Sequence, residues 1–270
     1  MSDFPQAAGL PADAHGHCRL EPFEGGVVLR LTRAAKLNAI TKPILLALDA
    51  CLRDMTAAGQ RLLIITGEGE KAFCAGTDLA ETQAMPPDAR LEKSAMARDL
   101  LVRLSRSPVV SVAAINGLAY GGGLELAMAC TLRVAAAHVR VSLPEIKLGL
   151  LPAYAGTQFL PALVGPSRAL DLMLTGRPVP ADEALAMGLV NRVVPAGESV
   201  LDHAIALGRE VTQFSPDAIA GIRRCVAAAG PEVTDAGLAV EDAVVRAVFL
   251  TENAREGVAA FLEKRPAVFR

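Results

Sequence analysis

The sequence predicts an α/β fold with parallel strand pairing, followed by a wholly helical C-terminal region. Over residues 18–197, short apolar segments of strand length alternate with segments of helical periodicity, which is typical of parallel strands joined by crossover helices. From Val200 onward the spacing of the apolar residues is helical only. Pro195-Ala196-Gly197 is the expected seam between this core and a helical region over 198–270. Residues 1–17 are expected to form a flexible tail.

The individual elements follow from the apolar pattern in chain order. Residues 27–31 alternate weakly after Gly25-Gly26, which predicts a strand preceded by a hairpin turn. Helical spacing predicts a helix over 41–58, with Thr41 as its N-cap and Pro43 in its first turn. Further strands are expected over 61–66, 109–115, 132–136 and 139–143, and further core helices over 90–105 and 122–130. The C-terminal helices are expected near 201–213, 216–229, 234–250 and 253–263.

Composition and charge argue against several classes of protein. Of the 270 residues, 52% are hydrophobic, yet no uninterrupted apolar run approaches the roughly 18 residues that suggest a membrane span. Basic and acidic residues number 27 and 29, and aromatic residues make up 4%, so no nucleic-acid partner is expected. Five dispersed cysteines without a C-x-x-C pair indicate reduced thiols and a cytoplasmic location. The first 17 residues lack the features of a signal peptide.

Two glycine-bearing turns carry the strongest functional signal. They lie within residues 72–79 and 116–127, and each precedes an expected helix, so each can present free backbone N–H groups. Two such turns facing each other would stabilise a developing oxyanion, which chemistry on an activated acyl group requires. The alternative for Gly121-Gly122-Gly123 is a helix start where close packing demands small side chains. The spacings of a Rossmann G-x-G-x-x-G motif and of a Walker loop are absent.

Two carboxylates accompany these turns. Glu125 stands in the first turn of the second expected helix, where the helix dipole alone would favour it, but its apolar neighbours indicate burial, and a buried carboxylate needs a reason. Glu145 follows Pro144, where it could equally be an exposed charge paired with Lys147. Two carboxylates in one apolar pocket would split their pKa values, which suits acid–base work on a single water molecule.

Other chemically reactive residues are expected to be structural. Cys74 has no histidine in a comparable glycine-rich context and is expected to pack as a small buried residue. His15, His17 and Cys18 form at most an adventitious cluster, so no metal site is predicted. Asp78 is expected to cap a helix or to anchor hydrogen bonds near the first glycine-bearing turn.

Taken together, these motifs resemble the enoyl-CoA hydratase/isomerase (crotonase) superfamily, and most of all its enoyl-CoA hydratases. The resemblance extends from about Gly25 to Phe269, nearly the full length of the chain. Its markers are Leu37-Asn38-Ala39, residues 72–79, 116–127 and 144–149, Gly156-Thr157-Gln158, Leu174-Thr175-Gly176, and residues 184–189 and 260–265. Any one marker alone is weak, whereas the set is specific.

The resemblance implies a catalytic core wound as a spiral of ββα units and a helical C-terminal trimerisation region, often assembled as a dimer of trimers. It implies that the backbone N–H groups of Thr77 and Gly122 form the oxyanion hole. Glu125 and Glu145 match the two catalytic glutamates, of which the first activates the water and the second delivers a proton to the α-carbon. No cofactor or membrane partner is implied, because coenzyme A is itself part of the substrate.

The resemblance also implies which residues bind the acyl-CoA. They are Lys36, Leu37, Ala75, Gly76, Asp78, Ala153, Tyr154, Phe261 and Lys264. The chain departs from the family pattern at some of these places. Ala35 stands where a lysine is usual, with Lys36 next to it. The usual Pro-Gly-Ala-Gly-Gly segment is here Pro152-Ala153-Tyr154-Ala155-Gly156, so Tyr154 could narrow the acyl pocket or add a hydroxyl to it.

Three functions remain open at this stage. The first is reversible hydration of a 2-enoyl-CoA, as in fatty acid metabolism. The second is Δ3–Δ2 isomerisation, which commonly needs only the carboxylate matching Glu145, or dehydration of a specialised acyl-CoA. The third is a catalytically silent acyl-CoA-binding or RNA-binding relative, against which the net charge of −2 and the two glutamates argue.

A homo-oligomer is expected because apolar residues of the C-terminal helices exceed what one core can cover, and the resemblance implies that it is a homotrimer or homohexamer. These residues are Ala243, Val244, Val248, Phe249 and Phe261.

Overall fold

The computed structural model describes residues 14–229 and 234–270. Contacts between residues divide the chain into two compact units, Met1–Gly208 and Arg209–Arg270. The seam expected at residue 197 lies in the turn before helix α8 (Val200–Thr212), and the division by contacts falls inside that helix. None of the helices in the described part of the chain is long and apolar enough to cross a membrane.

Most of the tail expected over residues 1–17 lies outside the described residues. Its last residues pack on the core, because Ala14 is fully buried and His17 Nδ1 lies 2.8 Å from the Thr41 hydroxyl. Thr41 does precede helix α1 (Lys42–Ala57), as predicted, but its side chain makes no capping hydrogen bond. The contact with His17 takes up the hydroxyl that was expected to cap the helix.

A six-stranded sheet forms the first layer of the larger unit. Its strands are β1 (Cys18–Phe23), β2 (Gly26–Leu31), β3 (Leu62–Gly67), β5 (Val110–Ile115), β7 (Leu132–Ala136) and β10 (Arg192–Val194), in the spatial order β1-β2-β3-β5-β7-β10. The hairpin β1–β2 is antiparallel, and all other neighbours pair in parallel, as the sequence predicts. Every residue of β3 and β5 is buried, which is why both strands are mostly apolar instead of alternating with polar residues.

A second sheet of very short strands stands beside the first. It consists of β4 (Ala72–Cys74), β6 (Leu118–Tyr120), β8 (Arg140–Ser142) and β9 (Val179–Pro180), in that spatial order. Each of β3, β5 and β7 is followed by one of these short strands and then by a helix, so the predicted ββα units are present. Only β8 was expected, because two or three residues are too few to show a periodic pattern.

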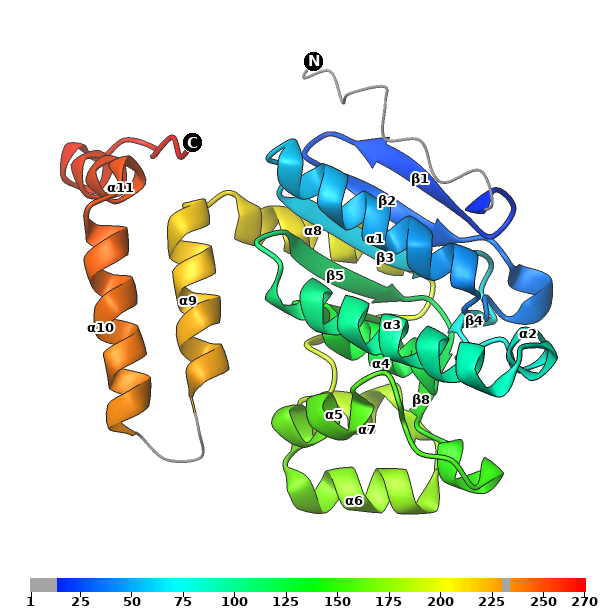
Figure 1. Cartoon of the computed structure of the whole chain (residues 1–270). Helices are drawn as coiled ribbons and strands as arrows, with labels where there is room; N and C mark the ends of the chain where they lie inside the picture. Colours follow the sequence, from blue (N-terminus) through cyan, green and yellow to red (C-terminus); the bar gives the residue numbers. More distant parts are fainter. Residues whose placement is uncertain (1–13, 230–233) are drawn as a thin grey trace. The chain divides into compact units, whose positions relative to one another are not determined.

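Helices cover both faces of the six-stranded sheet: in Figure 1, α1 lies in front of it and α8 behind it. The approach of α8 to β3 is close, since a Cβ at Gly208 would lie 2.4 Å from Leu62 Cδ1. The other helices of this unit are α2 (Leu79–Ala84), α3 (Pro87–Arg106), α4 (Gly122–Ala129), α5 (Gly156–Val164), α6 (Pro166–Thr175) and α7 (Ala181–Ala186), with 3-10 turns η2 (Ala34–Lys36) and η3 (Glu145–Leu148).

The smaller unit contains α9 (Pro216–Ala228), α10 (Asp235–Phe249) and α11 (Glu252–Glu263), close to the predicted bounds. Helices α9 and α10 pack closely, because a Cβ at Gly221 would lie 2.8 Å from Val244 Cγ1. Val244 was expected on an apolar outer face and is instead only 8% exposed within this pair. Phe249 and Phe261 are 72% and 82% exposed, so apolar surface does remain on this unit.

Candidate active site

The first glycine-bearing turn is held as an extended segment between β4 and α2. Ile40 N–H donates to the Gly76 carbonyl over 2.7 Å, and Asp78 N–H donates to the Ile40 carbonyl over 2.8 Å. These bonds form a parallel bridge between Ile40 and Thr77. Because alternate peptide groups of an extended segment face opposite edges, the Thr77 N–H points away from Ile40. Gly76 makes this path possible at a φ of +102°, a value that favours glycine.

The second glycine-bearing turn connects β6 to α4. Gly121 has a φ of +52°, and its N–H donates to the Ser142 carbonyl over 2.9 Å. Gly122 then opens α4, where the first N–H groups have no acceptor inside the helix. A Cβ at Gly123 would lie 2.1 Å from the Cys74 carbonyl oxygen, so small residues are required for packing here as well. The packing explanation of the glycine run is therefore confirmed, and the functional explanation stays a prediction.

The two turns lie in direct contact with each other. The Gly122 nitrogen is 3.4 Å from the position of a Cβ at Gly76, and the Thr77 nitrogen is 3.6 Å from the position of a Cβ at Gly122. Among residues 14–229 and 234–270, neither the Thr77 N–H nor the Gly122 N–H has a hydrogen-bond acceptor. Two unsatisfied amide donors thus stand side by side.

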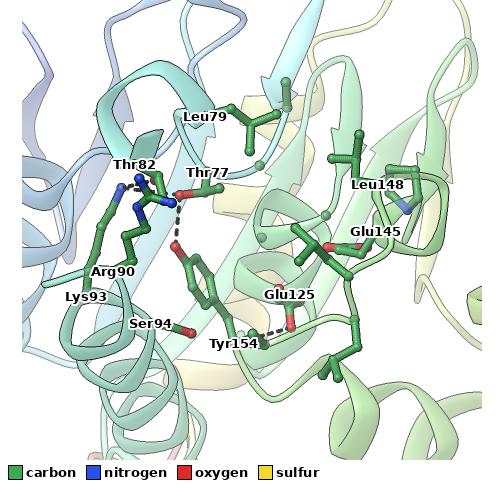
Figure 2. A pocket seen from close by; sticks show the side chains of 18 residues that line it. Thr77, Leu79, Thr82, Arg90, Lys93, Ser94, Glu125, Glu145, Leu148 and Tyr154 are labelled. Carbon is green, nitrogen blue, oxygen red and sulfur yellow. Dashed lines mark hydrogen bonds between the residues drawn. The ribbon is translucent and has the colours of Figure 1, made fainter. Parts of the chain in front are cut away.

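A cavity of about 200 Å³ opens beside these two amides. Its wall contains both turns, both predicted glutamates, Ala153 and Tyr154, together with residues of α3 and of the segment after η3. Figure 2 shows Glu125 and Glu145 projecting into this region from different parts of the chain. The structure therefore brings together Thr77, Gly122, Glu125 and Glu145, which the sequence could place only in separate motifs.

Glu125 is buried and fixed by backbone donors. Its side chain is 1% exposed, and its Oε1 accepts the N–H groups of Tyr154 and Gly156, each over 2.7 Å. Burial raises the pKa of Glu125 from 4.5 to about 7; the two hydrogen bonds oppose this shift, and the charge of Glu145 adds to it. A Cβ at residue 156 would lie 2.7 Å from Oε1, so Gly156 is needed for this arrangement.

Glu145 begins the 3-10 turn η3 and is half-buried. Its Oε2 is buried and has no hydrogen-bond partner in the described part of the chain. Burial raises the pKa of Glu145, and its own backbone N–H opposes that shift. A Cβ at residue 121 would lie 2.8 Å from Glu145 Oε1, so this carboxylate also packs against a glycine. The alternative of an exposed charge is therefore wrong for Glu145.

Tyr154 connects the carboxylate side of the cavity to the first glycine-bearing turn. Its hydroxyl donates to Thr77 Oγ1 over 3.0 Å, and the same oxygen accepts from Lys93 Nζ over 3.3 Å. Lys93 is 3% exposed and forms an ion pair with Glu81 at 2.5 Å. Lys93 and Glu81 were not predicted, because an isolated lysine or glutamate on a helix gives no signal in a sequence.

The residues expected to contact coenzyme A are distributed more widely. Lys36 and Leu37 lie at the end of η2, and Leu37 adopts a φ of +50°. Asp78 caps α2 by accepting the Glu81 N–H over 3.0 Å, and Arg33 donates to it over 2.8 Å, so its structural role is confirmed. Its role in binding substrate stays a prediction.

Two further predicted contacts belong to the smaller unit. Phe261 lies in α11, and Lys264 follows that helix with a φ of +54°.

Cys74 is fully buried, which confirms its expected packing role, and burial raises the pKa of its thiol to about 12. Among the described residues, no group of three or more histidine, cysteine, aspartate and glutamate side chains is arranged to hold a metal ion.

The fold and site together define an α/β protein of ββα units that presents two backbone amides, one buried carboxylate and one half-buried carboxylate in one cavity. The chain belongs to the enoyl-CoA hydratase/isomerase family, whose family model matches residues 23–270. It is 37% identical to a crotonyl-CoA hydratase of Syntrophomonas wolfei over 95% of this chain and 98% of that protein. It is 34% identical to a short-chain-enoyl-CoA hydratase of Clostridium acetobutylicum over 90% of this chain and 93% of that protein.

Solved structures show the same similarity. The crystal structure of an enoyl-CoA hydratase from Bacillus anthracis superposes with a TM-score of 0.88 at 33% identity, covering 94% of this chain and 98% of that one. The predicted crotonase-like fold with a helical C-terminal region is confirmed.

Proposed function

We propose that this protein is an enoyl-CoA hydratase, a hydro-lyase that reversibly adds water to a 2-enoyl-CoA thioester. One observation carries the proposal: the unsatisfied amides of Thr77 and Gly122 border the same cavity as Glu125 and Glu145. The family and the hydratases to which the chain is similar support the same reaction.

The amides act on the thioester carbonyl. Donation from the Thr77 and Gly122 N–H groups polarises the carbonyl, which makes the β-carbon electrophilic and stabilises the enolate that follows. Each such donor contributes roughly 10²–10³-fold to the rate in comparable sites. The chemistry of these groups needs no cofactor beyond the coenzyme A of the substrate.

The two glutamates act on the water and the α-carbon. Glu125 accepts a proton from the water as its oxygen bonds to the β-carbon, and Glu145 gives a proton to the α-carbon. Protons exchange with solvent before the next turnover, so the balance is one water added per alkene. Glu125 suits the first role because its Oε1 is held by two N–H donors, which leaves Oε2 to hold the water. The raised pKa values allow one acid and one base near neutral pH.

Turnover of crotonyl-CoA, followed by the absorbance of the conjugated thioester, tests this proposal. We expect Glu125→Gln and Glu145→Gln each to lose roughly 10²–10⁴-fold in kcat. Glu92→Gln is the matched control, because Glu92 is exposed on α3 outside the cavity. Full activity in either cavity variant would remove that residue from the mechanism. The absence of turnover with every 2-enoyl-CoA would overturn the hydratase assignment.

Isomerisation is the second candidate, because Glu145 has a buried oxygen without a partner in the described residues and can carry a proton by itself. Incubation with a 3-enoyl-CoA separates the two activities. An isomerase would convert it and would retain this activity in Glu125→Gln, whereas a hydratase would act far better on the 2-enoyl isomer.

We also propose a homo-oligomer, a trimer or a dimer of trimers, formed through the C-terminal helices. The exposed side chains of Phe249, Leu250 and Phe261 support it, because large apolar surfaces on soluble proteins are commonly interfaces. Light scattering at micromolar concentration is expected to give a mass of three or six chains. A monomer at that concentration would contradict this proposal.

A further inference from the structure

On the basis of the hydratase function proposed above, we infer that Tyr154 closes the acyl end of the cavity and restricts the substrate to short acyl chains. The sequence left two roles open for this residue, a narrower pocket or an added hydroxyl. In the structure the two roles combine, because the hydroxyl holds the ring in the position that narrows the pocket.

Tyr154 is fixed at three places around the site. Its N–H donates to Glu125 Oε1 over 2.7 Å, and its hydroxyl donates to Thr77 Oγ1 over 3.0 Å. Its ring lies against the second glycine-bearing turn, since a Cβ at Gly122 would be 2.9 Å from the ring carbon Cε2. The residue is 7% exposed. Through its backbone N–H and its side chain together, Tyr154 therefore connects Glu125 to both residues that supply amides.

A charged network behind Thr77 keeps the ring in place. Lys93 Nζ donates to Thr77 Oγ1 over 3.3 Å, to Thr82 Oγ1 over 3.2 Å and to Glu81 Oε2 over 2.5 Å. Buried networks with charged members are strong and geometrically specific. Swinging the ring away would break the bond from Tyr154 to Thr77. Burial also raises the pKa of the Tyr154 phenol to about 12, so the phenol keeps the proton it donates.

The hydrogen bond between Tyr154 and Thr77 stands between two parts of the cavity. In Figure 2, Glu125, Glu145 and Leu148 lie on one side of it, and Arg90 and Lys93 of α3 lie on the other. An acyl chain that continued from the reacting carbons toward α3 would therefore meet the tyrosine ring.

The opposite wall of the cavity borders solvent. Leu148, Leu150 and Leu151 line it and are 60%, 56% and 64% exposed. This open side can admit the thioester and its coenzyme. Because the ring separates the part of the cavity beside the glutamates from α3, the acyl group must fit within that part, which is smaller than the whole cavity of about 200 Å³. That volume is below the roughly 300–1,000 Å³ of pockets that enclose drug-sized ligands. An acyl group of four to six carbons is the class that fits.

The experiment compares trans-2-enoyl-CoA substrates of four, six, eight and ten carbons. We expect kcat/KM of the natural protein to fall at least tenfold from the four-carbon to the eight-carbon substrate, since each misfitting methylene in a pocket costs roughly 10-fold or more. Equal or rising kcat/KM with chain length would overturn the inference, because the tail would then lie over the exposed leucines instead of facing Tyr154.

Two variants locate the effect at this ring. Tyr154→Ala removes the wall, and Tyr154→Leu retains an apolar side chain in case the smaller residue prevents folding. In a folded variant, the ratio of eight-carbon to four-carbon kcat/KM is expected to rise at least tenfold. An unchanged ratio in both variants would show that another residue limits the chain. Tyr120→Phe is the matched control, because it removes the hydroxyl of the other tyrosine of the chain and is expected to leave the ratio unchanged.

A binding measurement separates failure of this inference from failure of the hydratase function. Calorimetric titration with butyryl-CoA and octanoyl-CoA requires no turnover. We expect the natural protein to bind butyryl-CoA at least tenfold more tightly and Tyr154→Ala to reduce that difference. Loss of turnover with this binding preference intact would overturn the hydratase proposal but not the inference that Tyr154 limits the length of the acyl chain. Equal affinity for both ligands in the natural protein would overturn the inference about Tyr154, even if the protein hydrates crotonyl-CoA.

Discussion

The turn that carries Glu125 and the turn that carries Glu145 hold the same functional group in different ways. Every residue of α4 is buried, and Glu125 accepts two backbone N–H groups through one oxygen. No residue of η3 is fully buried, and Glu145 keeps a buried oxygen without a partner in the described part of the chain. One carboxylate is fixed by the backbone around it, and the other is enclosed but less constrained.

This difference supports separate roles for the two carboxylates. A carboxylate with one oxygen fixed can orient a water molecule through the other oxygen, which positions the nucleophile. A carboxyl group with an unsatisfied oxygen in an apolar setting holds a proton readily, because burial disfavours its charged form. The three predictions that follow test this comparison, from the largest expected effect to the smallest.

Exchange of the α-hydrogens of butyryl-CoA with D₂O isolates the role assigned to Glu145. Glu145→Gln is expected to slow the exchange by roughly 10²–10⁴-fold, because Glu145 is the group to which we assign proton transfer at the α-carbon. Glu125→Gln is expected to keep the exchange within about tenfold of the natural rate, since its assigned partner is the water. Mass spectrometry of the recovered thioester measures both. Equal losses in the two variants would show that the two glutamates do not have separate roles.

The pH dependence of stability tests the burial of Glu125. Its pKa is raised from 4.5 to about 7 in the folded protein, so the folded state binds more protons than the unfolded state between these values. The stabilising contribution of the proton is complete below pH 4.5 and is lost as pH rises through 7. The loss amounts to about 3 kcal/mol. Urea unfolding at pH 5 and pH 8 is expected to show this decrease and to show a smaller one for Glu125→Gln. The same decrease in both proteins would place its origin elsewhere.

Substituting the two glycines that face the carboxylates is expected to have the smallest effect on activity of the changes considered. Gly156→Ala places a methyl group within 2.7 Å of Glu125 Oε1, and Gly121→Ala places one within 2.8 Å of Glu145 Oε1. Each is expected to lower kcat by roughly tenfold through a displaced carboxylate. Gly121→Ala should also reduce stability by about 1 kcal/mol, because Gly121, unlike Gly156, has a positive φ.

Kinetics and thermal unfolding measure both effects of the glycine substitutions. Gly257→Ala is the control, because its added Cβ would meet only an ordinary contact at 3.4 Å. If kcat fell as much in this control as in Gly121→Ala and Gly156→Ala, the effect could not be assigned to the carboxylates.

The long elements of the fold were predictable because each shows its own periodic pattern. Strand β3 and helix α1 have enough residues to reveal continuous or helical burial, and their bounds agree with the sequence within one residue. Strands β4 and β6 have three residues each, and they pair with partners far along the chain, so they were missed. Helices α5, α6 and α7 were also absent from the predicted elements.

The same distinction applies to the site. Gly76, Gly122 and Glu125 belong to compact motifs in which a turn and the following helix are adjacent in sequence, so local patterns indicated them. Glu145 had only a weak local signal and was proposed through the family resemblance. Lys93 was missed because its importance comes from bonds to Thr77 and Glu81 that no local pattern reveals.

The sequence by itself determined the longer strands and helices of the core, the two glycine-bearing turns and Glu125. Those features depend on burial periodicity and turn chemistry, which act over a few neighbouring residues. Only the tertiary structure decided that Tyr154 would bond to a threonine 77 positions earlier and to a glutamate 29 positions earlier. Such contacts depend on how separate ββα units pack against one another, and packing is a property of the whole core.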